Sequence, residues 1–282
     1  MKVIPFQVPK INKEAFRIQT DNAPKFYDKL HQHPENQIML IKKGAGTLIA
    51  GDYVGRFSSG DLFLIGSNQP HVFRSDESTS KSKSRVCGIS LYFDEKYAGE
   101  NFWQLNELVT IRNFITHAGV GYRIDNDTNV KLTKLIEDLI KLTGIERLLS
   151  FIQLLKTLSE SQDLKSLSAA GSKIRFSGSE GKRMNDILQF SLTQSFRKVK
   201  IKEVADVANL STEAFCRYFK LRTGKTYTNF LNEVRVSNAC KMLIEKEKSI
   251  QEICFETGFA NLSHFNRTFK KITRKTPTRY VT

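Results

Sequence analysis

Three histidines in the first quarter of the sequence have the types and spacing of metal ligands. His31 and His33 are two residues apart, so on a strand both side chains would point to one face, and His71 could supply a third imidazole. Such a cluster could hold a single Fe, Mn or Zn ion. One hypothesis is therefore a metal-dependent enzyme that uses His31, His33 and His71.

Glu35 is the carboxylate closest in sequence to this pair. It follows His33 by only two residues, with Pro34 between them, which is close for a further ligand of the same ion. The other interpretation is that His31, His33, Glu35 and His71 line or support a ligand pocket without a metal. We expect this second role and no cofactor, and the sequence leaves open whether the cluster binds a metal.

A second group of residues forms a repeat in the last hundred residues. The pattern F-x-R-x-F-K occurs at residues 215–220 and again at 265–270, and a short amphipathic segment precedes each copy. Asn209 or Gly258 lies between the two parts of each copy, where a left-handed turn is best tolerated. Each copy therefore predicts a helix-turn-helix.

A helical wheel separates two faces on the second helix of each copy. The aromatic residues and Leu262 gather on one face, which we expect to pack in a core. The N-cap residues and the opposite face give the candidate DNA contacts: Ser211, Glu213, Cys216, Arg217 and Lys220 in the first copy, and Asn261, Ser263, Asn266, Arg267, Lys270 and Lys271 in the second. Arginine can pair with guanine, asparagine with adenine, and lysine mostly meets phosphate. The alternative is a face that is only solvated.

The distribution of charge favours DNA. The chain of 282 residues has a formal net charge of +15. Residues 181–282 contain 20 Lys or Arg and 9 Asp or Glu, a balance of +11, so residues 1–180 hold only +4. Clustered basic side chains bind nucleic acid by releasing counterions from its phosphates.

A segment predicted as helical from about Thr226 to Glu245 joins the two copies. About 20 residues at a rise of 1.5 Å give a rod of about 30 Å. Successive major-groove faces on one side of B-DNA are roughly 34 Å apart. One chain could therefore reach two adjacent grooves.

The predicted elements change in type along the chain. In the first hundred residues, short apolar runs bounded by Gly, Asp and Asn predict the strands of a β-sandwich or small barrel. From residue 101 the apolar spacing is helical, with two helices hairpinned at Gly144. Residues 166–181 are rich in small polar residues, which is typical of an interdomain linker, and helices are predicted from there to the end.

Targeting and redox signals are absent from the sequence. No run approaches the roughly 18 apolar residues of a membrane span, and the first residues lack the apolar core of a signal peptide. We therefore expect a cytoplasmic protein that does not enter a membrane. The four cysteines form no CxxC pair, which predicts reduced thiols rather than zinc ligands.

Residues 201–280 resemble the DNA-binding region of the AraC family of bacterial transcription regulators. The segments VADVANLS, FKLRTGK, FLNEVRVSNACKML, IQEICFETGF and FNRTFKKITRKTPTRY occur in the order and spacing of that family. The connecting helix matches the family pattern R-x-x-x-A-x-x-x-L at Arg235, Ala239 and Leu243. Two positions depart from the family: Tyr227 stands where proline is frequent, and Arg274 stands where glycine is common.

The resemblance implies a role for each candidate residue. Base-reading residues would be Glu213, Cys216 and Arg217 in the first module and Ser263, Asn266 and Arg267 in the second, with Lys220, Lys270 and Lys271 as positioning contacts. It also implies RNA polymerase as a partner and a homodimer as the assembly.

The N-terminal half resembles the cupin-type sensing domain that is common in the same family. The resemblance rests on the segments HQHPENQIMLIKKGAGTLIAGD and GDLFLIGSNQPHVF, which contain His31, His33, Glu35 and His71. The helices around residues 101–160 would complete this domain and offer a dimerisation surface.

We therefore expect an α+β multidomain protein. A cupin-like β-barrel with a helical hairpin occupies residues 1–163, a linker residues 164–181, and an all-α double helix-turn-helix domain residues 182–282. The expected function is transcription regulation by sequence-specific binding of double-stranded DNA in response to a small-molecule effector. We expect an activator, and the sequence leaves repression open. We do not expect an enzyme.

Overall fold

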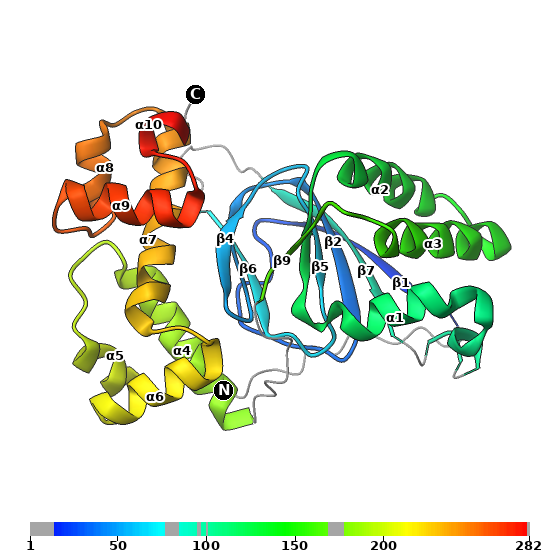
Figure 1. Ribbon diagram of the computed structural model, residues 1–282, viewed down its shortest axis with the longest axis horizontal. Coiled ribbons are helices and arrows are strands. Elements are labelled where there is room, and N and C mark those ends of the chain that lie inside the picture. The colour runs from blue at the N-terminus through cyan, green and yellow to red at the C-terminus, as the bar shows by residue number, and fades with distance from the viewer. Residues whose placement is uncertain (1–13, 77–84, 95–96, 100, 169–177, 281–282) are drawn as a thin grey trace. The chain divides into compact units, whose positions relative to one another are not determined.

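The computed structural model describes residues 14–76, 85–94, 97–99, 101–168 and 178–280. The chain divides into two compact units that meet in sequence near residue 175. The described residues up to 168 form strands and helices, and the described residues from 178 onward form helices only (Figure 1). The predicted fold class, an α+β unit followed by an all-α unit, is confirmed.

Nine strands of the N-terminal unit form two sheets within the described residues. The larger sheet is antiparallel and has the order β1 (Arg17–Ala23), β7 (Val86–Phe93), β2 (Asn36–Lys43), β5 (Leu62–Ile65), β8 (Tyr122–Ile124) and β9 (Leu164–Ser166). The smaller sheet has the order β4 (Tyr53–Phe57), β3 (Gly46–Ala50) and β6 (His71–Ser75). The strands predicted from the apolar runs are therefore present.

Both faces of the larger sheet are covered, and alternate residues of its central strands enter different cores. Ile38 of β2 belongs to the core that contains the helices, whereas its neighbour Met39 packs toward the smaller sheet. The rings of Phe63 in β5 and Phe73 in β6 lie 5.8 Å apart, which shows that the two sheets pack face to face. This double burial explains why β2 is apolar throughout instead of alternating.

Three α-helices pack on the other face of the larger sheet (Figure 1). They are α1 (Val109–His117), α2 (Asn126–Leu139) and α3 (Gly144–Ser159), with 3₁₀ turns η1 (Phe102–Gln104), η2 (Asn106–Leu108) and η3 (Ala118–Val120). Gly144, the first residue of α3, has a φ of 54°, and α2 contacts α3, so the predicted helical hairpin is confirmed. No helix in the described part of the chain is long and apolar enough to cross a membrane.

Two parts of the predicted linker, residues 164–181, form regular structure. Leu164–Ser166 is strand β9 and pairs with β8, and helix α4 begins at Gly178. A three-residue strand is too short to show periodicity, and its last two residues are polar and exposed, so pattern analysis missed it. Residues 169–177 lie outside the described residues.

Seven helices build the described part of the C-terminal unit. They are α4 (Gly178–Gln194), α5 (Ile201–Val207), α6 (Thr212–Thr223), α7 (Tyr227–Glu245), α8 (Ile250–Glu256), α9 (Leu262–Thr273) and α10 (Pro277–Tyr280). Helix α7 has 19 residues and contacts α4 and α6 as well as α8, α9 and α10. At a rise of 1.5 Å per residue it is about 28 Å long.

Candidate nucleic-acid interface and ligand cavity

The first helix-turn-helix module consists of α5, a turn and α6. Asn209 adopts a φ of 53° in the turn, and the Ser211 hydroxyl accepts a hydrogen bond of 3.2 Å from the Ala214 N–H at the start of α6. Phe215 and Phe219 are fully buried, with ring centroids 5.3 Å from the Tyr227 ring of α7. The predicted turn, N-cap and aromatic core face are all confirmed in this module.

The second module, α8, a turn and α9, repeats this geometry. Asn261 Oδ1 accepts a hydrogen bond of 2.8 Å from the His264 N–H, so Asn261 caps α9 as predicted. Gly258 has a φ of 86°. A Cβ atom at this position would lie 2.2 Å from the carbonyl oxygen of Ser195, which leaves room for glycine alone.

The core face of α9 differs from the predicted one at two residues. Phe265 and Phe269 are fully buried, as expected. Leu262, expected beside them, is 38% exposed because it is the first residue of the helix and lies at the edge of the core. Thr268 is buried on this side of the helix instead.

The candidate DNA contacts all reach solvent. Ser211, Glu213, Cys216, Arg217 and Lys220 in the first module and Asn261, Ser263, Asn266, Arg267, Lys270 and Lys271 in the second are all exposed. The face therefore offers carboxylate and amide acceptors, hydroxyls, and cationic donors, which are the groups that read base edges and phosphates. Cys216 is exposed as well, so it is not a core packing residue.

The basic side chains on this face are not neutralised by acidic partners in the part of the chain that the structure describes. In the described residues Arg217, Lys220, Arg267, Lys270 and Lys271 form no ion pair. Elsewhere in the unit, acidic partners hold Arg197, Arg222, Lys225 and Lys248. A surface whose positive charges are left unneutralised is suited to bind an anion, since no internal pair must be broken first.

Arg235 of α7 joins the two modules. Its Nε donates to the Ser195 carbonyl at 2.9 Å, its Nη2 donates to the Arg197 carbonyl at 2.7 Å, and its guanidinium lies 5.7 Å from the centre of the Phe259 ring. Ser195 and Arg197 follow α4, whereas Phe259 belongs to the second turn. This one side chain therefore connects the segment between α4 and α5 with the turn of the second module, which gives a physical role to the arginine of the family pattern.

The three histidines of the N-terminal unit converge. One ring nitrogen of each lies within 4.8 Å of those of the other two, and all three residues are buried. Backbone hydrogen bonds between His31 and His71, of 2.8 and 3.1 Å, bring the segment before β2 alongside β6. Burial lowers the pKa of His31 to about 4, lowers that of His33, and lowers that of His71 well below its usual value, so the rings are neutral near pH 7.

Gln37 lies at the centre of this cluster and was missed by sequence reasoning. Its Oε1 is 3.3 Å from His33 Nε2 and 3.1 Å from His71 Nε2. Its Nε2 contacts the hydroxyls of Ser90 at 2.9 Å and Tyr92 at 3.3 Å. In the sequence, Gln37 could have been recognised as a neighbour of the histidines from its position four residues after His33, at the start of the first apolar run.

Glu35 does not join the histidines at the point where they converge. Its Oε2 lies 3.6 Å from His33 Nδ1, on the opposite edge of that ring from Gln37, and its Oε1 accepts a hydrogen bond of 2.9 Å from the Tyr97 hydroxyl. Glu35 is buried and contacts the Nδ1 edge of the His33 ring.

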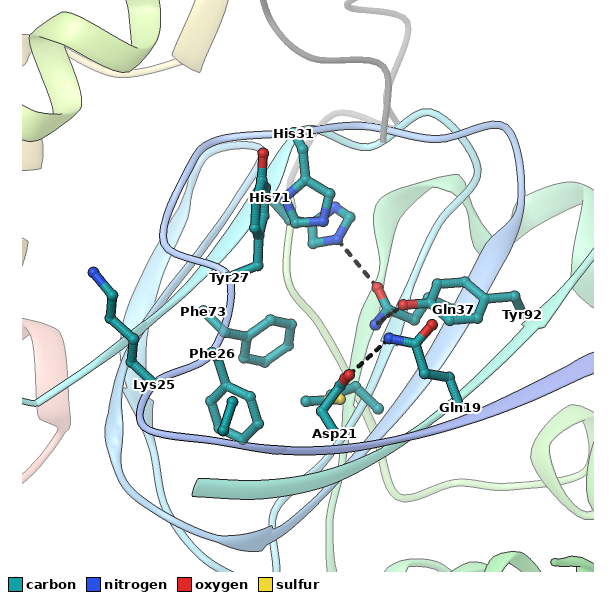
Figure 2. A pocket seen from close by; sticks show the side chains of 12 residues that line it. Gln19, Asp21, Lys25, Phe26, Tyr27, His31, Gln37, His71, Phe73 and Tyr92 are labelled. Atoms are coloured by element: carbon teal, nitrogen blue, oxygen red, sulfur yellow. Dashed lines mark hydrogen bonds between the residues drawn. The ribbon is translucent and has the colours of Figure 1, made fainter. Parts of the chain in front are cut away.

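A cavity of about 320 Å³ opens beside the cluster (Figure 2). Alternate residues of β1 and β2 face it, together with aromatic residues and two of the histidines. Its lining is Gln19, Asp21, Ala23, Lys25, Phe26, Tyr27, His31, Gln37, Met39, His71, Phe73 and Tyr92. His31 and His71 line this cavity, while His33 and Glu35 lie outside its lining. The effector role expected of the four residues stays a prediction.

Comparison with known proteins gives the same two-part division. A family model described as an AraC-like ligand binding domain matches residues 15–102, and one described as a helix-turn-helix domain matches residues 204–282. Together they account for more than half of the chain, in the order of the two structural units. The chain belongs to the AraC family of transcription regulators.

Relatives that this AraC-family chain matches over most of their length are named as transcriptional regulators. The uncharacterized HTH-type transcriptional regulator YdeC of Bacillus subtilis is 24% identical over 90% of this chain and 86% of its own. The HTH-type transcriptional activator RhaS of an Enterobacter species is 21% identical over 86% of this chain and 83% of its own. Among solved structures, ToxT of Vibrio cholerae is 13% identical over 95% of this chain and 97% of its own, with a TM-score of 0.36.

This AraC-family protein is therefore a DNA-binding transcription regulator with an N-terminal ligand-binding domain. The matched domains and the named relatives are those of regulators and not of enzymes. The hypothesis of a metal-dependent enzyme receives no support from them.

Proposed function

We propose that this regulator reads two successive major grooves of double-stranded DNA, one with α6 and one with α9. The observation that carries the proposal is the repeated exposed face, on which five cations have no ion-pair partner in the described residues. In this proposal Glu213, Cys216, Arg217, Ser263, Asn266 and Arg267 contact bases. Ser211, Lys220, Asn261, Lys270 and Lys271 orient the helices and meet phosphates.

The connecting helix supports the spacing that this proposal needs. Helix α7 is about 28 Å long, close to the roughly 34 Å between successive major-groove faces. It packs against α6 near one end and against α8 and α9 near the other. We propose that residues 182–282 form the DNA-binding domain and that residues 1–163 form the effector-binding domain.

A pair of variants tests the difference between base reading and phosphate binding. Arg267→Ala should cost about 1–3 kcal/mol on the preferred site and relax selectivity at one base pair. Lys270→Ala should weaken binding to all sequences similarly and reduce the salt slope by about one. Fluorescence anisotropy on preferred and random duplexes measures both, with Lys43→Ala in the N-terminal unit as the control. Equal losses on both duplexes for Arg267→Ala would remove Arg267 from base reading.

The cavity suggests the chemistry of the effector. Asp21, Gln19 and Lys25 offer charged and polar groups, and Phe26 and Phe73 offer apolar rings. We propose a small molecule that has hydroxyl or amide groups on one side and an apolar face on the other. Effector binding would shift the DNA-binding state only as far as the affinities of the two states for it differ.

Assembly and regulatory sign also belong to this proposal. Exposed apolar side chains lie on α2 and α3, among them Val130 (71% exposed), Ile145 (64%) and Leu149 (53%), and they support a homodimer formed through this hairpin. We propose a cytoplasmic activator that contacts RNA polymerase, on the strength of the family and of relatives named as activators.

A further inference from the structure

The two helix-turn-helix modules end in turns that share one hydrogen-bond pattern. After α6, the Thr223 hydroxyl donates to the carbonyl four residues before it at 2.7 Å and accepts from the Lys225 N–H at 3.4 Å. After α9, the Thr273 hydroxyl donates to the carbonyl four residues before it at 2.9 Å and accepts from the Lys275 N–H at 3.2 Å. Lys225 and Lys275 are therefore equivalent residues in the two turns.

The side chains of these two lysines are in different environments. Lys225 Nζ lies 2.9 and 2.8 Å from the two carboxylate oxygens of Glu233 in α7, and only 17% of the Lys225 side chain and 21% of the Glu233 side chain are exposed. Lys275 is exposed, and it forms no ion pair within the described residues. Because the pair in the first module is largely shielded from water and salt, Lys225 must leave Glu233 before it can bind another anion.

The residues around the two turns increase this difference in charge. Three equivalent positions are each more positive by one charge in the second module, which has Ser263, Lys271 and Arg274 where the first has Glu213, Leu221 and Gly224. Residues 262–276 contain five Lys or Arg and no acidic residue, whereas residues 212–226 contain four Lys or Arg and one Glu. Arg222 of the first module is also paired, with Glu180. In the described chain, the second turn therefore offers unpaired positive charge and the first does not.

The position of the two turns relative to the recognition helices bears on phosphate contacts. In helix-turn-helix proteins the N-terminal part of the recognition helix reads base edges, and in homeodomains the C-terminal end of that helix contacts the DNA backbone. In each module, the lysine of the turn lies five residues after the lysine, Lys220 or Lys270, that the proposed function assigns to a phosphate. A lysine of the turn that has no acidic partner is therefore available to a neighbouring phosphate.

We propose that Glu233 holds Lys225 away from DNA phosphate, so that the two modules bind the DNA backbone unequally. This inference rests on the proposed function, in which α6 and α9 enter successive major grooves. The second module, through Arg274 and Lys275, binds the backbone of any sequence, because phosphate contacts carry no sequence information. The first module has fewer such contacts and depends more on its base contacts. Glu233 is a positioning residue, since it acts through Lys225 and does not touch DNA.

Glu233→Gln tests the proposal by a gain of binding, which a misfolded variant cannot imitate. Glutamine keeps the size of the side chain and removes its charge, so Lys225 becomes free to bind a phosphate. The affinity for a random duplex should then depend more steeply on salt, by about 0.9 in the slope, which makes its gain over the wild type about 3.5-fold larger at 50 mM than at 200 mM salt. Salt-dependent fluorescence anisotropy with the full-length protein measures this change.

Two controls separate the release of Lys225 from a general change of charge. The double variant Glu233→Gln/Lys225→Ala should return the slope to the wild-type value, because the released cation is gone. Glu245→Gln removes the same charge from the other end of α7, where Glu245 Oε1 lies 4.0 Å from Lys241 Nζ, and should leave the slope unchanged. An unchanged slope in Glu233→Gln, a gain that persists in the double variant, or an equal gain in Glu245→Gln would overturn the proposal.

Two lysine variants show which claim fails. Lys275→Ala should lower the slope by about 0.9, since it removes a phosphate contact of the second module. If Lys275→Ala lowers the slope and Glu233→Gln does not raise it, the proposed function stands and the role of Glu233 is rejected. If Lys270→Ala and Lys275→Ala both leave the slope unchanged, the second module does not face phosphates, and the proposed function fails together with this inference.

Discussion

Arg274 ends helix α9 in the left-handed region of backbone conformation, with a φ of 63° and a ψ of 1°. Gly224 holds the equivalent position after α6, with a φ of 71°. A residue other than glycine costs roughly 1 kcal/mol or more in this conformation. This cost is the reason that glycine suits the position, and we expect the charge of Arg274 to contact a DNA phosphate.

Arg274→Gly should therefore separate stability from binding. We expect the free energy of unfolding of the C-terminal unit to rise by up to about 1 kcal/mol, because the backbone strain is relieved. We expect affinity for any duplex to fall by a similar amount, with a salt slope lower by about one. Urea denaturation and salt-dependent anisotropy measure the two quantities. Lower stability together with unchanged DNA affinity would contradict both parts.

At the level of elements, the turns of the two modules adopt a left-handed backbone conformation with different residues. Asn209 and Gly258 both have positive φ. Asn209 is exposed, whereas Gly258 lies against the Ser195 carbonyl, which also accepts from Arg235. The turn of the second module is thus packed on the end of α4, and Arg235 donates a hydrogen bond to the same Ser195 carbonyl. Together these contacts position the turn of the second module against the segment that follows α4.

The turn substitutions should differ sharply in their effects. Gly258→Ala forces a Cβ to within 2.2 Å of the Ser195 oxygen and adds backbone strain, so we expect a loss of about 2–4 kcal/mol in stability. Asn209→Gly, at the equivalent turn, should change stability by less than about 1 kcal/mol. Chemical denaturation of both variants measures the difference. Similar losses at the two sites would show that the contact at Gly258 does not matter.

How far the sequence predicts these elements depends on the strength of each local signal. The repeated F-x-R-x-F-K pattern and the capping residues Ser211 and Asn261 located both modules, because helix periodicity and caps are encoded within a few residues. Strand β9 and the edge position of Leu262 were not predicted, because tertiary pairing and the limits of a core decide them. Gln37 was missed because its partners come from β6 and β7, far away in sequence.

At the scale of the whole molecule, the N-terminal unit presents an apolar surface that the described chain does not cover. Val130 of α2, Ile140 directly after α2, and Ile145 and Leu149 of α3 are all exposed large apolar side chains. Side chains four apart on a helix share a face, so Ile145 and Leu149 form one stripe. A second copy of the chain would remove this surface from water.

Leu149→Glu should weaken the dimer, because it places a charge in the middle of that surface. We expect analytical ultracentrifugation to show the wild type as a dimer, and the variant to need at least about tenfold higher concentration to associate, which is about 1.4 kcal/mol. Lys43→Glu, which adds negative charge elsewhere on the same unit, is the control. A monomeric wild type, or equal association of all three proteins, would count against the hairpin as the interface.

The central claim is that each helix-turn-helix module reads its own stretch of DNA from the polar face of α6 or α9. In vitro selection from random duplexes with the wild type, Arg217→Ala and Arg267→Ala tests it most directly. We predict a preferred site of two blocks about one helical turn apart, with each variant losing sequence preference in a different block. A site of one block, or the same loss in both variants, would contradict the claim.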